Sequence, residues 1–596
     1  MKSGLECVTM AKWKVFINKK GNAGYIIAMI FIISVVIRTV LGIAFGQMNV
    51  FFDELLHWNL SKSAYYHLGS LFRNDMLNYN EILYSVVISV SHFFGNTEMQ
   101  YFIAVGINSI LMSSVVFPIY AMSGSFLGSR YQAVILSFVS IMLPEMAYTA
   151  KIIQENLYYP MTIWFFYLFI FLILRNPYRK RNMVFLGSYV FAVSLCKQMA
   201  LNIFTGVVLY YLLQFLFFDK ENRKKCAVCL LWFTAVFGSL KMLYGVLFNL
   251  ANGLVTESSS EVTIGVILGN LLDPYLISQL IYPAVTYLLL SVMFSGLFTV
   301  ILPLSLVKEL SVKERNLLLI IGTIFTSTVM VICLRIIPAE NLDVVKIRFH
   351  FRYLFYLVVP LLILFLSMKD RLAGGKYLKR TALLSLLYIL LLNYISILPE
   401  EGSKIDCAGA NYIKYLFESE MMQNTLRILI IIVMSFCLYL LHRKKIKLFY
   451  SVILAGFVVS GIVNNCYTYS EFYENKQQSV SKKEDAFTIN SYFHDIINKE
   501  DNSLLIISET KYSEGKLEVY LQHPDYYLCK MEDFKEFADG YSGGSFAGLT
   551  MNSFNIEFRD EELNCPEYII SYEPIRLEGY KETDIALNRY HMYERK

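Results

Sequence analysis

The sequence predicts a polytopic α-helical membrane protein with about 13 transmembrane helices, interfacial helices in its first outer loop, and a C-terminal extracytoplasmic α/β domain. Of its 596 residues, 56% are hydrophobic and only 17% are charged, whereas an ordinary soluble domain has about 25% charged residues. Residues 465–596 carry a net charge of −11, and residues 1–464 a net charge of +16. A basic, apolar body followed by an acidic, polar tail indicates two domains, 1–464 in the membrane and 465–596 outside it. The expected surroundings are therefore the lipid bilayer, and nucleic acid is not an expected partner.

Thirteen stretches of the first domain are apolar enough to cross a bilayer core, which needs about 20 residues per helix. They are expected near residues 25–46, 102–122, 132–149, 156–174, 183–199, 201–218, 226–248, 276–306, 317–337, 353–368, 381–398, 424–441 and 448–464.

Lys and Arg residues select the orientation of these spans, because the cytoplasmic loops of membrane proteins are enriched in them. With a cytoplasmic N-terminus, 26 Lys and Arg residues fall in inner segments and 10 in outer ones. An odd number of spans then places the C-terminal domain outside the cell membrane. Residues 25–46 are expected to remain as an anchor, because they are too long for a removable signal peptide and lack a small-residue cleavage site.

The first outer segment, 47–101, is too long for a turn and too polar to span the membrane. Its pattern predicts an amphipathic helix in the membrane interface that begins with Asp53 and Glu54. Asp53 and His57 share one face of this helix. Asp53 could serve only as a helix cap, but an adjacent acidic pair at an apolar boundary costs desolvation that a Ser cap would avoid. A second, half-length apolar stretch, 82–94, is expected to lie beside this helix.

Acidic and basic residues also occur where later spans meet the outer face. Glu155 lies where the chain re-enters the membrane, and ionisable groups at that depth usually face a cavity or a partner. The alternative for Glu155 is a simple ion pair with Lys151, four residues earlier. Glu145 is a weaker candidate of the same kind. Lys197 lies between two spans, and the sequence does not decide between a functional cation and an ordinary loop charge.

A basic cluster precedes the span expected at 353–368. It contains Lys346, Arg348 and Arg352, followed by Tyr353. Arg348 and Arg352 are four residues apart, so on a helix they present two guanidinium groups to the same side. The planar guanidinium suits phosphate oxygens better than the Lys ammonium does. Snorkelling of interfacial Arg side chains is the alternative, and this loop alone does not decide between the two.

The acidic tail predicts a small α/β domain. Residues 503–508 and 567–571 are strand-like, and the acidic helix-like segment 531–538 lies between them. A disulfide is conceivable among three cysteines of this tail, but the sequence does not assign it: Cys466, Cys529 and Cys565.

These residues, in this order and on one side of the membrane, resemble the C-type superfamily of membrane glycosyltransferases that use polyprenyl-phosphate sugars. That superfamily includes the bacterial transferases of aminoarabinose to lipid A and the protein O-mannosyltransferases. The resemblance rests on the thirteen-span plan, the outer C-terminal domain, the Asp53-Glu54 pair, the re-entry at 155–157 and the Arg352-Tyr353 start of a late span. The sequence departs from members near the lipid A branch at 78–81, where Asn-Tyr-Asn-Glu replaces a Lys-Pro-Pro-like segment.

The resemblance implies an enzyme that moves a sugar from a polyprenyl phosphate to a glycan, lipid or protein acceptor, with inversion at the anomeric carbon. Asp53 is then expected to act as the general base. Glu54 or Glu155 would orient the acceptor or help to hold a divalent cation, although no cofactor is firmly implied. The donor phosphate is expected to be bound by four cations: Lys197, Lys346, Arg348 and Arg352. The acceptor is expected to be oriented by His57 and Tyr353.

Two other functions make similar demands on a sequence. A lipid flippase or transporter often contains paired halves, but the sequence shows no such repeat and thirteen spans do not divide evenly. An outer-face polysaccharide polymerase or ligase would also handle polyprenyl substrates, but it would not particularly require the early Asp-Glu pair. A scaffold or sensor without catalysis is a further alternative.

Overall fold

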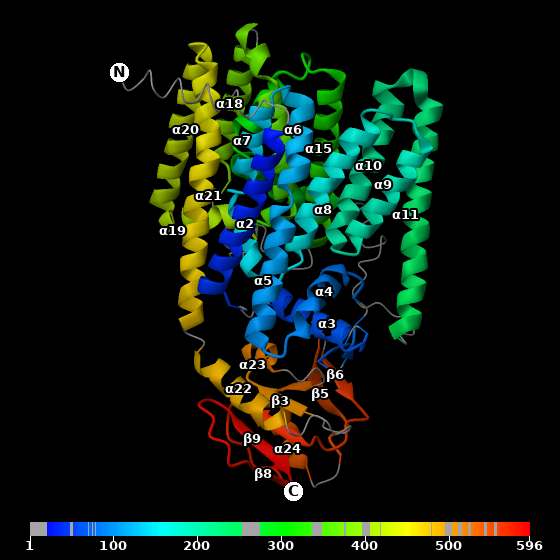
Figure 1. The fold of residues 1–596 in the computed structure, drawn as a ribbon, viewed down its shortest axis with the longest axis vertical. Coiled ribbons are helices and arrows are strands. Elements are labelled where there is room, and N and C mark those ends of the chain that lie inside the picture. The colour runs from blue at the N-terminus through cyan, green and yellow to red at the C-terminus, as the bar shows by residue number, and fades with distance from the viewer. Residues whose placement is uncertain are drawn as a thin grey trace.

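A computed structural model of the protein describes most of residues 21–596. The undescribed positions are 1–20, 48–51, 70, 74, 78, 253–273, 337–348, 375–376, 396–405, 418, 478–479, 495–503, 511–514, 522–525, 542–544 and 554–556. A bundle of long helices forms one end of the molecule and a small α/β domain the other (Figure 1).

The bundle contains eight helices, among the described residues, that are long and apolar enough to cross a membrane. A helix suits this task because it pairs its backbone N–H and C=O groups internally, where lipid offers no partners. Thr97–Leu127 and three of the other spans join an α-helix to a second helix or a π-turn. The elements are α2 (Asn22–Phe45), α5 (Thr97–Ser113) with α6 (Val116–Leu127), α8 (Glu155–Leu168) with η3 (Phe169–Ile173), α10 (Leu201–Leu213) with η5 (Gln214–Phe218), α11 (Arg223–Asn252), α15 (Val312–Val331) with η7 (Ile332–Ile336), α20 (Glu420–His442) and α21 (Ile446–Gln477).

Two further spans are broken. The helix α7 (Arg130–Ser140) meets η2 (Pro144–Ala150) at an angle of 55°, and α13 (Pro274–Phe294) meets α14 (Phe298–Ser305) at 103°. At the second break Gly296 has a φ of 89°, which glycine adopts readily because it has no Cβ. Shorter helices occupy the other predicted spans: α9 (Lys180–Ser194), α17 (Val358–Ser367) and α18 (Leu378–Leu392).

Helices occur in the described part of each predicted segment, but the described residues support eight full spans, or ten if each bent pair counts as one. The predicted multi-pass helical architecture is confirmed at that level, while the number thirteen and the orientation of the chain stay predictions. The helix α21 runs through residue 465 and ends only at Gln477, so a single helix leads from the bundle to the acidic tail.

The first outer segment lies between the bundle and the C-terminal domain (Figure 1). It contains α3 (Phe52–Tyr65), the hairpin of β1 (Leu71–Phe72) and β2 (Asp75–Met76), α4 (Leu83–Ile88) and η1 (Ser89–Phe93). The expected helix at Asp53 is present, but its polar face does not meet water, because every residue from 54 to 63 is buried. The place of this helix in the membrane interface stays a prediction, and the C-terminal domain contacts the helix through Trp58 and Lys62.

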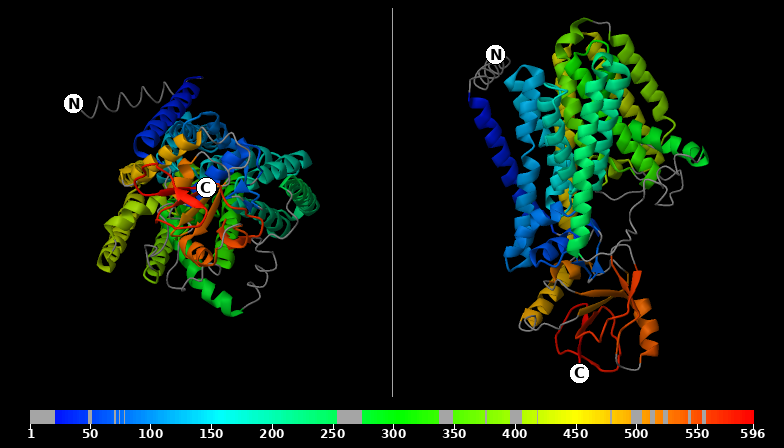
Figure 2. Two further views of the ribbon diagram at one scale, coloured as in Figure 1. Left: turned by 90° about the horizontal axis from the view of Figure 1, so that it is seen from below. Right: turned by 90° about the vertical axis from the view of Figure 1, so that its right-hand side faces the viewer.

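The acidic tail forms the predicted α/β domain at one end of the molecule (Figure 2). Its five-stranded sheet has the order β4-β3-β7-β9-β8, in which β3 runs parallel to β4 and β7, and β9 runs antiparallel to β7 and β8. The strand β3 consists of buried residues only, as expected for a central parallel strand. Helices and strands are α22 (Val480–His494), β3 (Leu504–Ser508), α23 (Gly515–Tyr520), β4 (Tyr527–Lys530), α24 (Met531–Gly540), β5 (Leu549–Asn552) paired with β6 (Glu557–Asp560), β7 (Tyr568–Ser571), β8 (Tyr580–Glu582) and β9 (His591–Arg595).

Buried polar contacts join this domain to the first outer segment. Arg73 donates twice to the Glu518 carboxylate, each time at 2.8 Å, and neither side chain is exposed. Trp58 Nε1 donates to the Val519 carbonyl at 3.1 Å, and Lys62 Nζ donates to the Leu521 carbonyl at 2.5 Å. The last two donors come from α3 and bind the carboxyl end of α23, where helix carbonyls lack partners. The helix that begins with Asp53 is therefore attached to the C-terminal domain.

A Glu518→Gln variant is expected to lose about 3–5 kcal/mol of stability at this contact, because the substitution leaves the buried Arg73 charge without its anionic partner. Thermal unfolding and limited proteolysis of the purified protein measure this loss. The control is Glu573→Gln, which removes an exposed ion pair with Lys535 and should change stability by less than about 1 kcal/mol. Equal behaviour of the two variants would contradict the prediction.

Candidate active site

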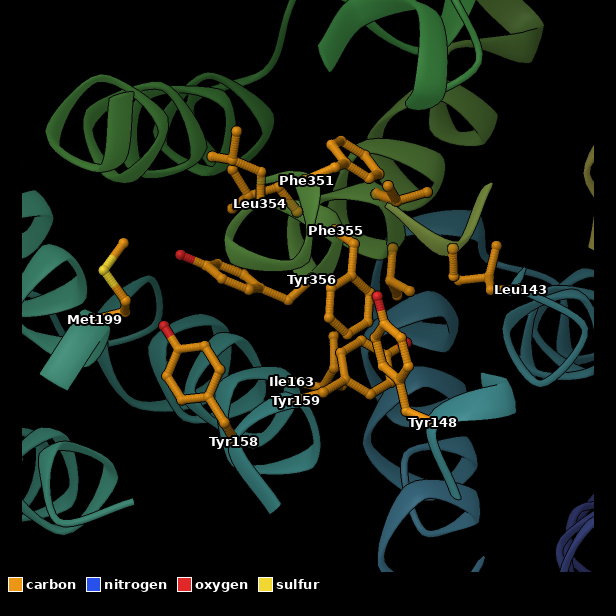
Figure 3. Packing of buried hydrophobic residues seen from close by; sticks show 14 of the residues in the cluster. Leu143, Tyr148, Tyr158, Tyr159, Ile163, Met199, Phe351, Leu354, Phe355 and Tyr356 are labelled. Atoms are coloured by element: carbon orange, nitrogen blue, oxygen red, sulfur yellow. The ribbon is translucent and has the colours of Figure 1, made fainter. Parts of the chain in front are cut away.

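Aromatic packing fixes the turn that carries Arg352. The turn is a 3-10 helix, η8 (Phe351–Tyr353), followed by η9 (Phe355–Leu357) and α17. The Phe355 ring stacks on Tyr159 with centroids 4.5 Å apart, and Tyr356 meets Tyr158 edge-on at 5.7 Å. Figure 3 shows these side chains interlocked between the turn and α8. Arg352 thus lies in a 3-10 turn, while Arg348, with which it would share a helix face, lies outside the described residues.

Three carboxylates from distant parts of the chain surround the Arg352 guanidinium. Arg352 Nη1 donates to Asp53 Oδ2 at 3.1 Å and lies 3.6 Å from Glu155 Oε1. Its Nε lies 3.3 Å from Asp406 Oδ1, and its backbone N–H donates to the Asp406 carbonyl at 2.8 Å. The Arg352 side chain is only 7% exposed, and a charge so far from water requires such partners. The structure therefore brings Asp53, Glu155 and Arg352 to one place.

Glu155 and Lys197 form a second buried ion pair beside the first. Glu155 is the first residue of α8 and has no exposed surface, and the Lys197 ammonium donates to its Oε1. That ammonium also lies 4.8 Å from the centre of the Tyr353 ring, a cation–π contact. Lys151, the alternative partner of Glu155, instead lies over the Phe472 ring at 4.7 Å. Lys197 is thus a buried site residue and not a solvated loop charge.

The two acidic residues at the start of α3 have different surroundings. The Asp53 side chain is 31% exposed, so its carboxylate can reach a molecule in solution. Glu54 has no exposed surface, and its Oε1 accepts a hydrogen bond from the Ile152 N–H at 2.9 Å. Glu54 therefore ties the segment before α8 to α3 and does not face the site. Of the predicted carboxylates, Asp53 is the most exposed.

His57 lies one turn after Asp53 in α3. Its Nδ1 lies 3.1 Å from Ser85 Oγ, and its ring meets Tyr84 edge-on at 5.4 Å. Burial lowers the pKa of His57 to about 4, although the Asp53 and Glu155 carboxylates act in the opposite direction. Loss of water disfavours the imidazolium form, so His57 is neutral near pH 7 and does not act there as a cation for phosphate.

The kinked segment before α8 is held by side chains from neighbouring helices. Arg38 of α2 is buried and donates to the Met146 carbonyl at 2.9 Å and also to the Ile141 carbonyl. Tyr101 donates to the Ala150 carbonyl at 2.7 Å. These carbonyls lie where α7 and η2 break the regular helix, and such breaks leave backbone groups that need other partners. The contacts fix the approach of the chain to Glu155.

Some site residues were not found from the sequence. Asp406 and His350 both belong to the site, and His350 Nδ1 lies 3.1 Å from Asp406 Oδ1. Asp406 lies between α18 and α19 with no motif around it, and a buried carboxylate that pairs with a distant Arg residue leaves no local pattern in the sequence. Arg38 had one, because an Arg in the middle of an apolar span is rare and usually paired.

Other predicted residues lie apart from this cluster or outside the described residues. Lys346 and Arg348 fall in the undescribed segment 337–348. Glu145 lines a mainly apolar cavity of about 410 Å³, together with Phe351 and Gly409.

Tyr353, in contrast, is part of the cluster, because its hydroxyl accepts from Arg352 Nη2 at 3.1 Å.

The described residues do not fit the divalent cation considered for Glu54 or Glu155. They contain no group of three or more His, Cys, Asp or Glu side chains arranged to hold a metal ion. Glu155 already carries the Lys197 ammonium and lies near the Arg352 guanidinium. Among the described residues no disulfide joins Cys466, Cys529 and Cys565.

Comparison with solved structures identifies the fold. No family model matches the sequence, and no curated protein matches it. The crystal structure of ArnT from Cupriavidus metallidurans bound to undecaprenyl phosphate matches with a TM-score of 0.51 and 13% identity, over 95% of this chain and 97% of that one. The apo structure of the same protein matches with a TM-score of 0.50 and 13% identity, over 96% and 98%. The chain has the fold of ArnT.

The resemblance stated from the sequence is thus confirmed for the fold. An oligosaccharyltransferase from Archaeoglobus fulgidus matches more loosely, with a TM-score of 0.44 and 11% identity over 83% of this chain and 64% of that one. At 13% identity the likeness to ArnT concerns the arrangement of the chain and carries no residue roles.

The pKa of His57 predicts a loss of stability in acid. The unfolded chain takes up a proton near pH 6.5 and the folded chain only near pH 4, so the contribution of His57 falls as the pH drops through this window. The expected loss is about 3 kcal/mol between pH 7 and pH 4. Unfolding of the detergent-solubilised protein over this range measures it.

A His57→Gln variant should show a shallower fall in stability over the same pH range than the wild-type protein. His442→Gln is the matched control, because His442 is exposed at the end of α20 and its replacement should leave the slope unchanged. A His57→Gln variant with the wild-type slope would contradict the assignment.

Proposed function

We propose that the protein is an integral membrane glycosyltransferase that moves a sugar from a polyprenyl-phosphate donor to an acceptor at the outer face of the cell membrane. The observation that carries the proposal is the partly exposed Asp53 carboxylate paired with the buried Arg352 guanidinium. Asp53 belongs to α3, which lies between the helical bundle and the C-terminal domain (Figure 1). The fold is further support, since ArnT, which shares it, has been crystallised with undecaprenyl phosphate.

In the proposed reaction Asp53 is the general base. A hydroxyl of the acceptor attacks the anomeric carbon of the donor sugar, and the Asp53 carboxylate takes the hydroxyl proton. The bond between that carbon and the phosphate oxygen breaks, and the electron pair leaves with the polyprenyl phosphate. A single displacement of this kind inverts the configuration at the anomeric carbon.

Arg352 and Lys197 are the described cations that would stabilise the charge developing on the departing phosphate. Their two positive charges stand against the three carboxylates of Asp53, Glu155 and Asp406, so this set alone has a formal charge of about −1. A phosphate therefore needs further positive charge nearby. Lys346 and Arg348, close to Arg352 in sequence, are the proposed source.

The proposal changes two of the roles expected from the sequence. Glu155 holds the Lys197 and Arg352 cations in place instead of acting on the acceptor. Glu54 binds the Ile152 backbone and has a structural role. Tyr353 supports both cations with its ring. The proposed acceptor is a glycan, a lipid or a protein of the cell envelope, with the N-terminus of the chain in the cytoplasm.

Asp53→Asn tests the proposed base. The substitution keeps the size of the side chain but removes its ability to take a proton, so sugar transfer from a polyprenyl-phosphate sugar should fall by about 10²–10⁴-fold. Binding of undecaprenyl phosphate should not weaken, because Asp53 carries a negative charge that repels phosphate. Radiolabelled sugar transfer to envelope acceptors and a binding titration measure the two effects.

The control is Asp370→Asn, in the exposed η10 turn (Lys369–Gly374), which should transfer sugar at the wild-type rate. An Asp53→Asn variant that transfers sugar normally would overturn the assignment of the base. A wild-type protein that moves lipid across the membrane without transferring sugar would favour a flippase instead.

A further inference from the structure

Asp406 contacts the Arg352 turn at more points than either of the other two carboxylates. Its carbonyl accepts from the Arg352 backbone N–H at 2.8 Å, and its Oδ1 lies 3.3 Å from Arg352 Nε. The same Oδ1 lies 3.1 Å from His350 Nδ1. Asp406 is only 2% exposed, so these contacts form away from water. One residue thus binds both the backbone and the side chain of the turn.

Asp406 contacts a different end of the Arg352 guanidinium from the one that Asp53 and Glu155 contact. Its Oδ1 forms an ion pair with the Nε end of the guanidinium at 3.3 Å without hydrogen-bond geometry, and the Nη1 end lies near Asp53 and Glu155. Because a guanidinium is planar and rigid, an ion pair at its Nε end limits where its Nη groups can lie. The backbone hydrogen bond sets the distance between Asp406 and the Arg352 main chain, so the side chain has little freedom to turn away.

His350 strengthens this arrangement from the other side. Its ring stacks on Tyr353 with centroids 5.4 Å apart and an angle of 17° between planes. Its backbone N–H donates to the Tyr287 hydroxyl at 3.0 Å. The stacked Tyr353 ring lies in turn against the Arg352 and Lys197 cations, 5.0 and 4.8 Å from its centre. The Asp406–His350 contact therefore bears on both cations of the site.

We infer that Asp406 is a positioning residue for the donor phosphate: it holds the Arg352 guanidinium and the His350–Tyr353 stack so that both cations face the departing phosphate. Asp406 itself touches neither donor nor acceptor. The inference rests on the proposed function, which supplies the phosphate. It explains why a third carboxylate is buried at a site that must attract an anion.

The test is Asp406→Asn in the full-length protein. Asn keeps the shape of the side chain and the backbone contact but cannot balance the Arg352 charge, so the guanidinium loses its fixed direction. The affinity for undecaprenyl phosphate is expected to fall about 10-fold, and kcat/KM for the polyprenyl-phosphate sugar about 10- to 100-fold, because small displacements of a catalytic group cost this much. The KM for the acceptor should stay unchanged.

The matched control is Asp485→Asn. Asp485 is also a buried aspartate, but it lies in α22, where its carboxylate accepts from the Asn588 and Arg589 backbone N–H groups. Its replacement should lower stability and leave undecaprenyl phosphate binding unchanged. A residue with only a structural role would behave in this way, so an Asp406→Asn variant that resembles this control overturns the inference.

A double-mutant cycle shows whether Asp406 acts through Arg352. Arg352→Gln alone should weaken undecaprenyl phosphate binding, and adding Asp406→Asn should then change the affinity by less than about 2-fold, since coupled residues are not additive. Independent, additive losses would contradict the inference. If Asp406→Asn does not fold, Arg352→Lys replaces it, because Lys keeps the charge but lacks the Nε edge; wild-type affinity in that variant overturns the inference.

The inference and the proposed function fail in different ways. If the wild-type protein transfers no sugar but its binding of undecaprenyl phosphate depends on Asp406, the proposed reaction is rejected and the positioning role is retained. If the wild-type protein transfers sugar but neither binding nor turnover changes in Asp406→Asn, the positioning role is rejected and the proposed reaction is retained. A wild-type protein that does not bind undecaprenyl phosphate overturns both.

Discussion

The burial of one guanidinium constrains the whole site. Arg352 lies at 7% exposure between Asp53, Glu155 and Asp406, and a charge in that position is tolerated only if its partners are held close. The partners come from α3, from the start of α8 and from a segment before α19 (Asn411–Leu416). Each of these elements must therefore hold its carboxylate within contact distance of the Arg352 guanidinium. Much of the surrounding structure keeps the elements in these positions.

Several contacts meet this requirement from outside the site. Arg38 and Tyr101 hold the broken segment before α8, and Glu54 ties it to α3. On the other side, Trp58 and Lys62 fasten α3 to the C-terminal domain. The acidic domain is thus a support for the helix that carries Asp53, whatever further role it has toward an acceptor.

Short-range sequence patterns predicted the helices, the strands and the charged residues at the ends of helices. Apolar length located the helices of the bundle, and alternation of strand-like and helix-like runs located the β3 and β7 strands and α24. Charges at membrane boundaries pointed to Asp53, Glu155, Lys197 and Arg352 because such groups are costly where water is scarce. No periodicity specifies which distant carboxylate meets which cation. Asp406 and the burial of α3 depend on such long-range contacts, and the sequence alone did not reveal them.

The most direct test of the account is the position of the phosphate in a cryo-electron microscopy map of the protein with undecaprenyl phosphate. The account predicts phosphate density within hydrogen-bonding distance of the Arg352 guanidinium, in one chamber with the Asp53 carboxylate. Phosphate density bound elsewhere on the protein, or Asp53 and Arg352 in separate compartments, would contradict it.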